Sequence, residues 1–106
     1  MSDAMNIKML LVVFNISIED EVMEIINKKG TPCFTRWPRV IGRGVSTGPK
    51  MDNDVWPGAN SAVMIVTTEK QALEIMADIQ ALRDEIGSHE GVKAFLLNVE
   101  KMTGDI

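Results

Sequence analysis

Residues 36–61, RWPRVIGRGVSTGPKMDNDVWPGANS, hold both tryptophans of the chain, three of its four prolines and four of its eight glycines. Glycine and proline at this density exclude a single helix or one continuous strand. The stretch is also longer than a hairpin turn, which usually has about two to five residues. Because rigid, amphipathic Trp side chains argue against plain disorder, we expect a functional loop that joins two structured halves.

The half before this loop reads as strand, helix, strand. Residues 7–14 (IKMLLVVF) are short and apolar nearly throughout, which predicts a strand buried on both faces. Ser17 then opens S-I-E-D, a start that resembles a capping box, and Gly30 supplies the C-terminal stop of the helix. The next segment, 33–43, contains Pro38, which cannot donate to a ladder, so we expect an edge strand that runs into the loop.

The half after the loop repeats this order. Residues 61–68 (SAVMIVTT) predict a third strand, again apolar on successive positions. Thr68 begins a second start that resembles a capping box, T-E-K-Q, and apolar residues at helical spacing follow until Gly87. Residues 92–99 (VKAFLLNV) predict the fourth strand, and the polar tail KMTGDI closes the chain.

The order strand, helix, strand, loop, strand, helix, strand is that of the split βαβ or ferredoxin-like fold. The fold class is therefore α+β: an antiparallel four-stranded sheet, with the first and third strands at its centre and two helices on one face. The long loop lies between strands two and three. A chain of 106 residues is of the size of one domain, and we expect a single domain over residues 1–106.

The strands carry more apolar residues than this fold can cover by itself. A sheet with helices on one side should alternate apolar and polar residues, yet 10–14, 62–66 and 95–97 are apolar on both alternations. The uncovered face would be a contiguous apolar patch, larger than a soluble monomer normally exposes. We therefore expect another subunit to cover it.

Composition narrows the class of protein. The net charge of -4 argues against general affinity for nucleic-acid phosphates, which depends on clustered cations. The single cysteine excludes an internal disulfide and fits a reducing compartment. No apolar run approaches the roughly 18 residues of a spanning helix, and the N-terminus does not resemble a secretory signal. We expect a soluble cytoplasmic protein.

Residues that could carry catalysis are scarce. His89, the only histidine, lies in a turn before the fourth strand, where we expect an exposed side chain without a catalytic role. Cys33 has no neighbour in the sequence that would activate it, so we expect a packed thiol. One His and one Cys make no zinc motif, and the eight methionines are spread like core residues. The sequence predicts a protein that is not an enzyme and identifies neither a metal nor a cofactor.

The loop holds the best candidates for binding. Gly42-Arg43-Gly44 places flexible backbone amides beside a cation, which are the ingredients of an anion-binding nest, and residues 48–50 (GPK) do the same. A basic arm that ends at Lys50 is followed by an acidic tip with Asp52 and Asp54. Trp37 and Trp56, each followed by proline, are expected to hold the two roots of the loop against the body or a neighbour.

These residues resemble the nitrogen-regulatory PII signalling proteins, in a divergent PII-like branch. Gly42-Arg43 is similar to the G-F-G-R entry of that family's protruding T-loop, and Val99-Glu100 to the V-E after its last strand. Gly87 and Lys93 match the ends of its B-loop. The resemblance implies a homotrimer with inward-facing sheets, ATP or ADP in clefts between subunits, and a T-loop that contacts partner proteins.

The chain also departs from the family. Glu90-Gly91-Val92-Lys93 stands in place of the glycine-rich G-D-G-K, and Gly44 in place of the glutamine that serves the metal and 2-oxoglutarate. The basic pair beyond the last strand is missing, and without any tyrosine no T-loop tyrosine can be uridylylated. The resemblance thus implies a small anionic ligand, a nucleotide among the candidates, that contacts Gly42, Arg43, Gly44, Gly87 and Lys93. It implies partner contacts at Lys50, Asp52 and Asp54.

Two alternatives share the element order. A trimeric protein of the divalent-cation-tolerance type would need metal donors, for which His89 and the loop aspartates are few. A small enzyme of the dimeric α+β barrel type would bury the apolar sheet face against one partner instead of two. The oligomeric state separates this reading from the trimeric ones.

Overall fold

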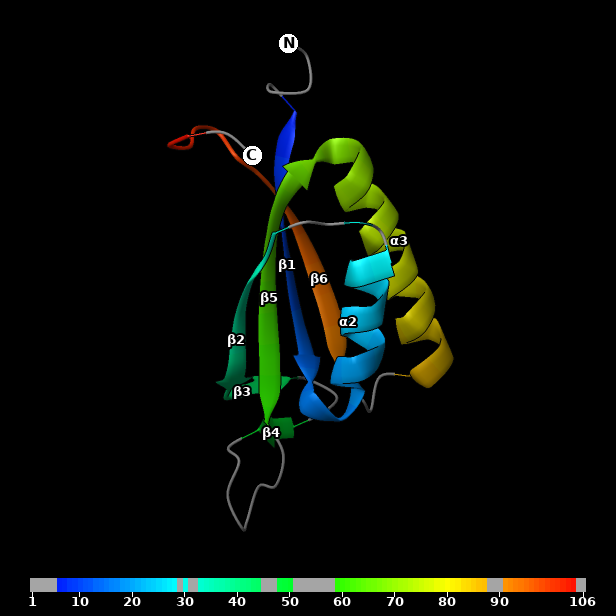
Figure 1. Cartoon of the computed structure of the whole chain (residues 1–106). Helices are drawn as coiled ribbons and strands as arrows, with labels where there is room; N and C mark the ends of the chain where they lie inside the picture. The colour runs from blue at the N-terminus through cyan, green and yellow to red at the C-terminus, as the bar shows by residue number, and fades with distance from the viewer. Residues whose placement is uncertain are drawn as a thin grey trace.

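The apolar run that begins at Ile7 forms a central strand of a four-stranded antiparallel sheet (Figure 1). The computed structural model describes residues 6–28, 30, 33–44, 48–50, 59–87 and 91–104, with only the backbone described at 43–44 and 48–50. The elements in chain order are β1 (Ile7–Asn15), the 3-10 turn η1 (Ile16–Ile18), α2 (Glu19–Lys28), β2 (Thr35–Val40), β3 (Gly42–Gly44), β4 (Gly48–Lys50), β5 (Asn60–Thr68), α3 (Glu69–Ile86) and β6 (Val92–Asn98).

The strand order β2-β5-β1-β6 confirms the predicted ferredoxin-like topology, with the first and third main strands at the centre. β1 pairs with β5 from Ile7 opposite Thr68 to Asn15 opposite Asn60. On its other side β1 pairs with β6, from Lys8 opposite Asn98 onward. Every neighbouring pair is antiparallel. Because β2 and β6 stand first and last in the strand order, they form the two edges of this sheet.

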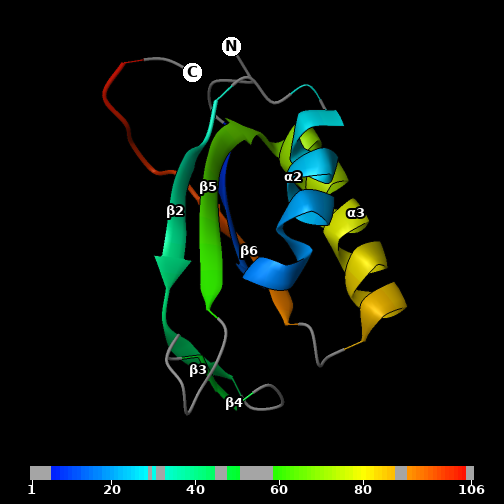
Figure 2. The same ribbon diagram turned by 60° about the horizontal axis from the view of Figure 1, so that its bottom comes forward.

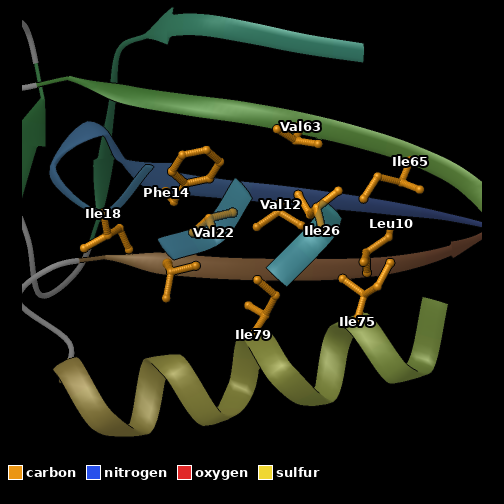
Figure 3. Packing of buried hydrophobic residues seen from close by; sticks show 11 residues of the cluster. Leu10, Val12, Phe14, Ile18, Val22, Ile26, Val63, Ile65, Ile75 and Ile79 are labelled. Atoms are coloured by element: carbon orange, nitrogen blue, oxygen red, sulfur yellow. The ribbon is translucent and has the colours of Figure 1, made fainter. Parts of the chain in front are cut away.

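Both helices lie on one face of the sheet, as predicted (Figures 1 and 2). The strands contribute alternate residues to the core between the layers, among them Leu10, Val12 and Phe14 of β1. Ile26 of α2 and Ile75 of α3 meet them from the helical side, and all five are at most 1% exposed (Figure 3). Each large apolar side chain buried in this way contributes about 1.5–3 kcal/mol to stability.

The two helix starts differ in how well the sequence predicted them. At α3 the Thr68 hydroxyl accepts a hydrogen bond from the Gln71 N–H at 3.3 Å, which confirms Thr68 as the N-cap. Ahead of α2 lies a 3-10 turn that the sequence did not predict, and Ser17 is within it. The Asn15 side chain caps this turn, because it accepts from the Ser17 N–H at 2.9 Å.

Strand β2 is an edge strand, as the proline predicted. Trp37 pairs with Ala62 of β5, whereas Val40 pairs with Asn60, so the register shifts between them. Pro38 lies within this irregular part, where its missing N–H interrupts no regular ladder. The register shift bends the chain away from the sheet toward β3.

Two short pieces of the segment between β2 and β5 form regular structure. Gly42 pairs with Lys50, Arg43 with Pro49 and Gly44 with Gly48, so β3 and β4 form a two-stranded antiparallel ribbon. The sequence did not predict this ribbon, because glycine and proline have low strand propensity and the pairing depends on backbone alone. Trp56, Asp52 and Asp54 lie outside the described residues. Within the described ranges, no helix is both long and apolar enough to cross a membrane.

Candidate functional site

One end of the sheet gathers most of the residues that the sequence singled out. The β3–β4 ribbon leaves the sheet at the end where α3 stops and β6 begins (Figures 1 and 2). Gly42, Gly44 and the backbone of Arg43 are placed there by β3, and Gly87 follows the last turn of α3. Lys93 is the second residue of β6. The structure therefore brings these five predicted positions to one end of the molecule.

Gly87 ends α3 in a conformation that favours glycine. Its φ of 81° and ψ of 173° lie outside the regions that other residues adopt easily, and its N–H donates to the Arg83 carbonyl at 3.0 Å. Gly42 is different, since the nearest described atom to a Cβ there, Asn60 Nδ2, lies at an ordinary 3.9 Å. The need for glycine is therefore structural at Gly87 and not at Gly42.

Lys93 projects from the face of the sheet that carries no helix. It lies opposite Val13 of β1, and strand alternation places its side chain on the same face as Phe95 and Leu97. No described acidic side chain forms an ion pair with Lys93. Its ammonium group is exposed and available to an anion.

The helix-free face, which we call the open face, is mostly apolar, and all four strands contribute apolar residues to it. One row of partners runs Trp37, Ala62, Val13 and Lys93, and the next runs Thr35, Met64, Leu11 and Phe95. Trp37 is 43% exposed, and Phe95 and Leu97 are each 45% exposed. The doubly apolar strands predicted such a face, and a patch of this kind usually marks an interaction surface.

A polar cluster that the sequence did not predict holds β2 to the body. The hydroxyl of Ser61, fully buried in β5, donates to the Pro38 carbonyl at 2.7 Å and lies 3.2 Å from Glu19 Oε1. The same carboxylate forms an ion pair with Arg36 of β2. The cluster fixes the strand that leads into the ribbon. A serine inside an apolar strand was the only signal in the sequence.

Several predicted positions cannot be placed in the site. At Lys50 only the backbone of β4 is described, and Asp52, Asp54 and His89 lie outside the described residues. Cys33 is exposed, so the expectation of a packed thiol was wrong: it lies ahead of β2, outside the core. Among the described side chains, no group of three His, Cys, Asp or Glu residues is arranged to hold a metal ion.

Comparison with known proteins shows which solved structures have this fold. No family model matches the sequence, and no curated protein matches it. Solved structures do. CPII, a nitrogen regulatory PII-like protein from Thiomonas intermedia K12 bound to ADP, AMP and bicarbonate, has a TM-score of 0.71 at 13% identity, over 88% of this chain and 85% of that one.

Two further solved structures are similar to this chain over most of its length. A PII-like signalling protein from Thermus thermophilus has a TM-score of 0.61 at 25% identity, over 88% of this chain and 86% of that one. A DUF3240 family protein from Shewanella baltica has a TM-score of 0.68 at 9% identity, over 93% of this chain and 96% of that one. The fold is thus of the open-sheet ferredoxin-like class. More particularly, it is the fold of the PII-like proteins, which confirms the predicted resemblance in architecture.

Proposed function

We propose that this chain is the subunit of a PII-like regulatory protein that forms a homotrimer through its open face and binds a small anionic ligand between subunits. The apolar open face carries the proposal. It spans all four strands, with Trp37, Phe95 and Leu97 each more than 40% exposed. Burying such surface stabilises an assembly by about 25 cal/mol for each Å² removed from water.

The charge distribution supports this orientation of the subunits. The outer surface of the helical layer carries exposed acidic residues, such as Asp20, Glu21 and Glu24 of α2 and Glu74 of α3. A charged helical layer suits solvent, whereas an apolar sheet suits a subunit interface. An assembly with its sheets facing inward and its helices facing outward therefore buries the apolar surface and leaves the charged surface in water.

The ligand would lie at the end of the sheet where the ribbon leaves it and where α3 stops and β6 begins. Gly42, Arg43 and Gly44 would supply backbone amides and a cation, and Gly87 and Lys93 would approach from the other side. Because Lys93 projects from the open face, a subunit packed on that face would share the ligand with it. ADP, AMP and bicarbonate, the molecules bound to CPII, are the first anions to try.

The remaining features complete the proposal. The loop 42–58 would contact a partner protein, with Lys50, Asp52 and Asp54 at the contact, as in a signalling protein. The chain would act as one cytoplasmic domain, without catalysis of its own and without affinity for nucleic acid. PII-like neighbours in which small anions are bound support this regulatory role.

Sedimentation equilibrium and calorimetric titration test the proposal together. We expect a mass of three chains and saturable binding of ADP, AMP or bicarbonate. Arg43→Ala should weaken that binding without changing the mass, whereas Arg39→Ala, an exposed cation on β2, should not. A monomer at every concentration would refute the shared site. A dimer would favour an α+β barrel enzyme, and binding of divalent cations alone would favour the cation-tolerance type.

A further inference from the structure

A groove runs between α3 and the free edge of β6, and one chain forms it entirely. Its volume is about 170 Å³, and its apolar floor consists of Met76 and Ile79 from the helix with Val92 and Ala94 from the strand. Gln80, Arg83 and Lys93 complete the lining. The volume is below the roughly 300–1,000 Å³ of sites for drug-sized molecules, so the groove suits a small ligand.

Arg83 supplies the charge at this groove. Its side chain donates from Nη1 to the Val92 carbonyl, which fixes the guanidinium at the edge of β6. No described carboxylate pairs with Arg83, and the nearby Asp84 accepts from Gln80 Nε2 at 2.9 Å. A guanidinium keeps several other N–H donors when one is used. Lys93 adds less, because strand alternation directs its side chain to the open face.

The edge of β6 supplies a second donor. The Asn15 N–H donates to the Gly91 carbonyl at 2.9 Å, and the Val99 N–H donates to the Ile7 carbonyl at 3.2 Å. In an antiparallel pair, residues alternate between those bonded to the partner strand and those whose N–H and C=O point away from it. The backbone N–H and C=O groups of the odd-numbered residues of β6 therefore point toward β1. The N–H of Ala94 points away from β1, out from the edge, next to the Val92 carbonyl that accepts from Arg83.

We infer that this groove binds the carboxylate of a small apolar acid. The carboxylate accepts from the Arg83 guanidinium and from the Ala94 N–H, and the hydrocarbon part lies on Met76 and Ile79. Charge-assisted hydrogen bonds from a guanidinium to a carboxylate are among the stronger polar contacts in proteins. An added β-strand fits less well, because Arg83 already occupies the Val92 carbonyl that such a strand would need. This site shares Lys93 with the proposed anion site between subunits, but its two donors, Arg83 and the Ala94 N–H, are not part of that site.

Hexanoate tests the inference on the full-length protein. With the methionine methyl groups labelled for NMR, hexanoate should shift the Met76 signal saturably, with a Kd of about 1 mM for so small a ligand. The Met64 signal, on the open face, should not move. Hexan-1-ol lacks the anion and acetate lacks the chain, so each should bind about tenfold or more weakly. Equal shifts with all three would overturn the carboxylate site.

Variants separate the charge from the fold. Arg83→Gln should weaken hexanoate about tenfold to a hundredfold, whereas Lys70→Gln, an exposed cation at the other end of α3, should leave it unchanged. Should Arg83→Gln disturb β6, Gln80→Glu keeps Arg83 and places an acid at the exposed rim. It should weaken hexanoate but not hexan-1-ol. Unchanged affinity in both variants would refute the site.

The experiment also separates this site from the one between subunits. ADP and bicarbonate should not displace hexanoate, and hexanoate should bind whether or not ADP does. If ADP displaces it, the groove belongs to the nucleotide site and the inference fails. If hexanoate binds while the protein stays a monomer at every concentration, the groove stands and the proposed function fails.

Discussion

Leu11 of β1 lies directly opposite Phe95 of β6, on the sheet face that no helix covers. Antiparallel partners bring their side chains close together, so this pair forms a continuous apolar surface with Met64 on the other side of Leu11. The next residue of β1, Val12, is fully buried under the helices. One strand thus contributes to two apolar surfaces, one under the helices and one on the open face.

Leu97→Glu tests the outer environment. Leu97 is 45% exposed on the open face, and a carboxylate buried there on assembly would cost about 2 kcal/mol or more. We expect sedimentation equilibrium to show dissociation of the assembly at concentrations where the wild type is intact. Leu73→Glu is the matched control, because Leu73 is 48% exposed on the helical layer. Equal behaviour of the two variants would mean that the open face is not the interface.

Ile75→Ala tests the inner environment. Ile75 is fully buried between α3 and the sheet, and deletion of its side chain removes apolar contacts and leaves a cavity. We expect a loss of about 2–5 kcal/mol in the free energy of unfolding, measured by urea denaturation. Ile41→Ala makes the same change at a residue that is 61% exposed and should cost little. A small loss at Ile75 would contradict the packing described here.

The sequence predicted the elements of this fold because their signals are local. Thr68 with Gln71 three residues later indicated the start of α3, and Pro38 indicated that β2 lies at an edge. The features that the sequence did not predict appear only in the folded backbone. A 3-10 turn capped by Asn15 follows β1. Cys33 was expected to be packed, but no local pattern shows that this residue, ahead of β2, lies outside the core.

The candidate site was predictable only in part, for the same reason. Glycines beside cations indicated Gly42 to Gly44, and a helix stop indicated Gly87. Arg83 carried no such signal, because a cation in the last turn of a helix is ordinary there. Its contact with the Val92 carbonyl appears only once α3 packs beside β6.

Gly87→Ala tests the backbone conformation at the end of α3. Its φ of 81° with a ψ of 173° is a region that L side chains rarely adopt, so alanine should cost about 1–3 kcal/mol in unfolding free energy. Within the described part of the chain no atom lies within 4 Å of the added Cβ, so the loss would come from the backbone and not from a clash. Gly42→Ala is the control, and we expect its stability to stay near that of the wild type. Equal stability of both variants would contradict the assigned conformation.

Thr68→Ala tests the cap of α3. The Thr68 hydroxyl accepts from the Gln71 N–H, and without it one N–H of the first helical turn loses its partner. We expect a loss of about 1 kcal/mol in the free energy of unfolding, read as a lower urea midpoint at constant slope. Thr68→Ser keeps the hydroxyl and should recover most of the loss. Equal losses in the two variants would assign the effect to the methyl group.

Ser61→Ala tests the polar cluster that holds β2. Ser61 is fully buried, and its hydroxyl is the donor to the Pro38 carbonyl, so alanine removes this hydrogen bond from the attachment of β2 to β5. We expect a loss of about 1–3 kcal/mol in unfolding free energy. Arg36→Met removes the ion pair with Glu19, but the Arg36 side chain is 32% exposed, so solvent screening should keep that loss below about 1 kcal/mol. A larger loss for Arg36→Met than for Ser61→Ala would show that the ion pair, and not the buried serine, holds β2.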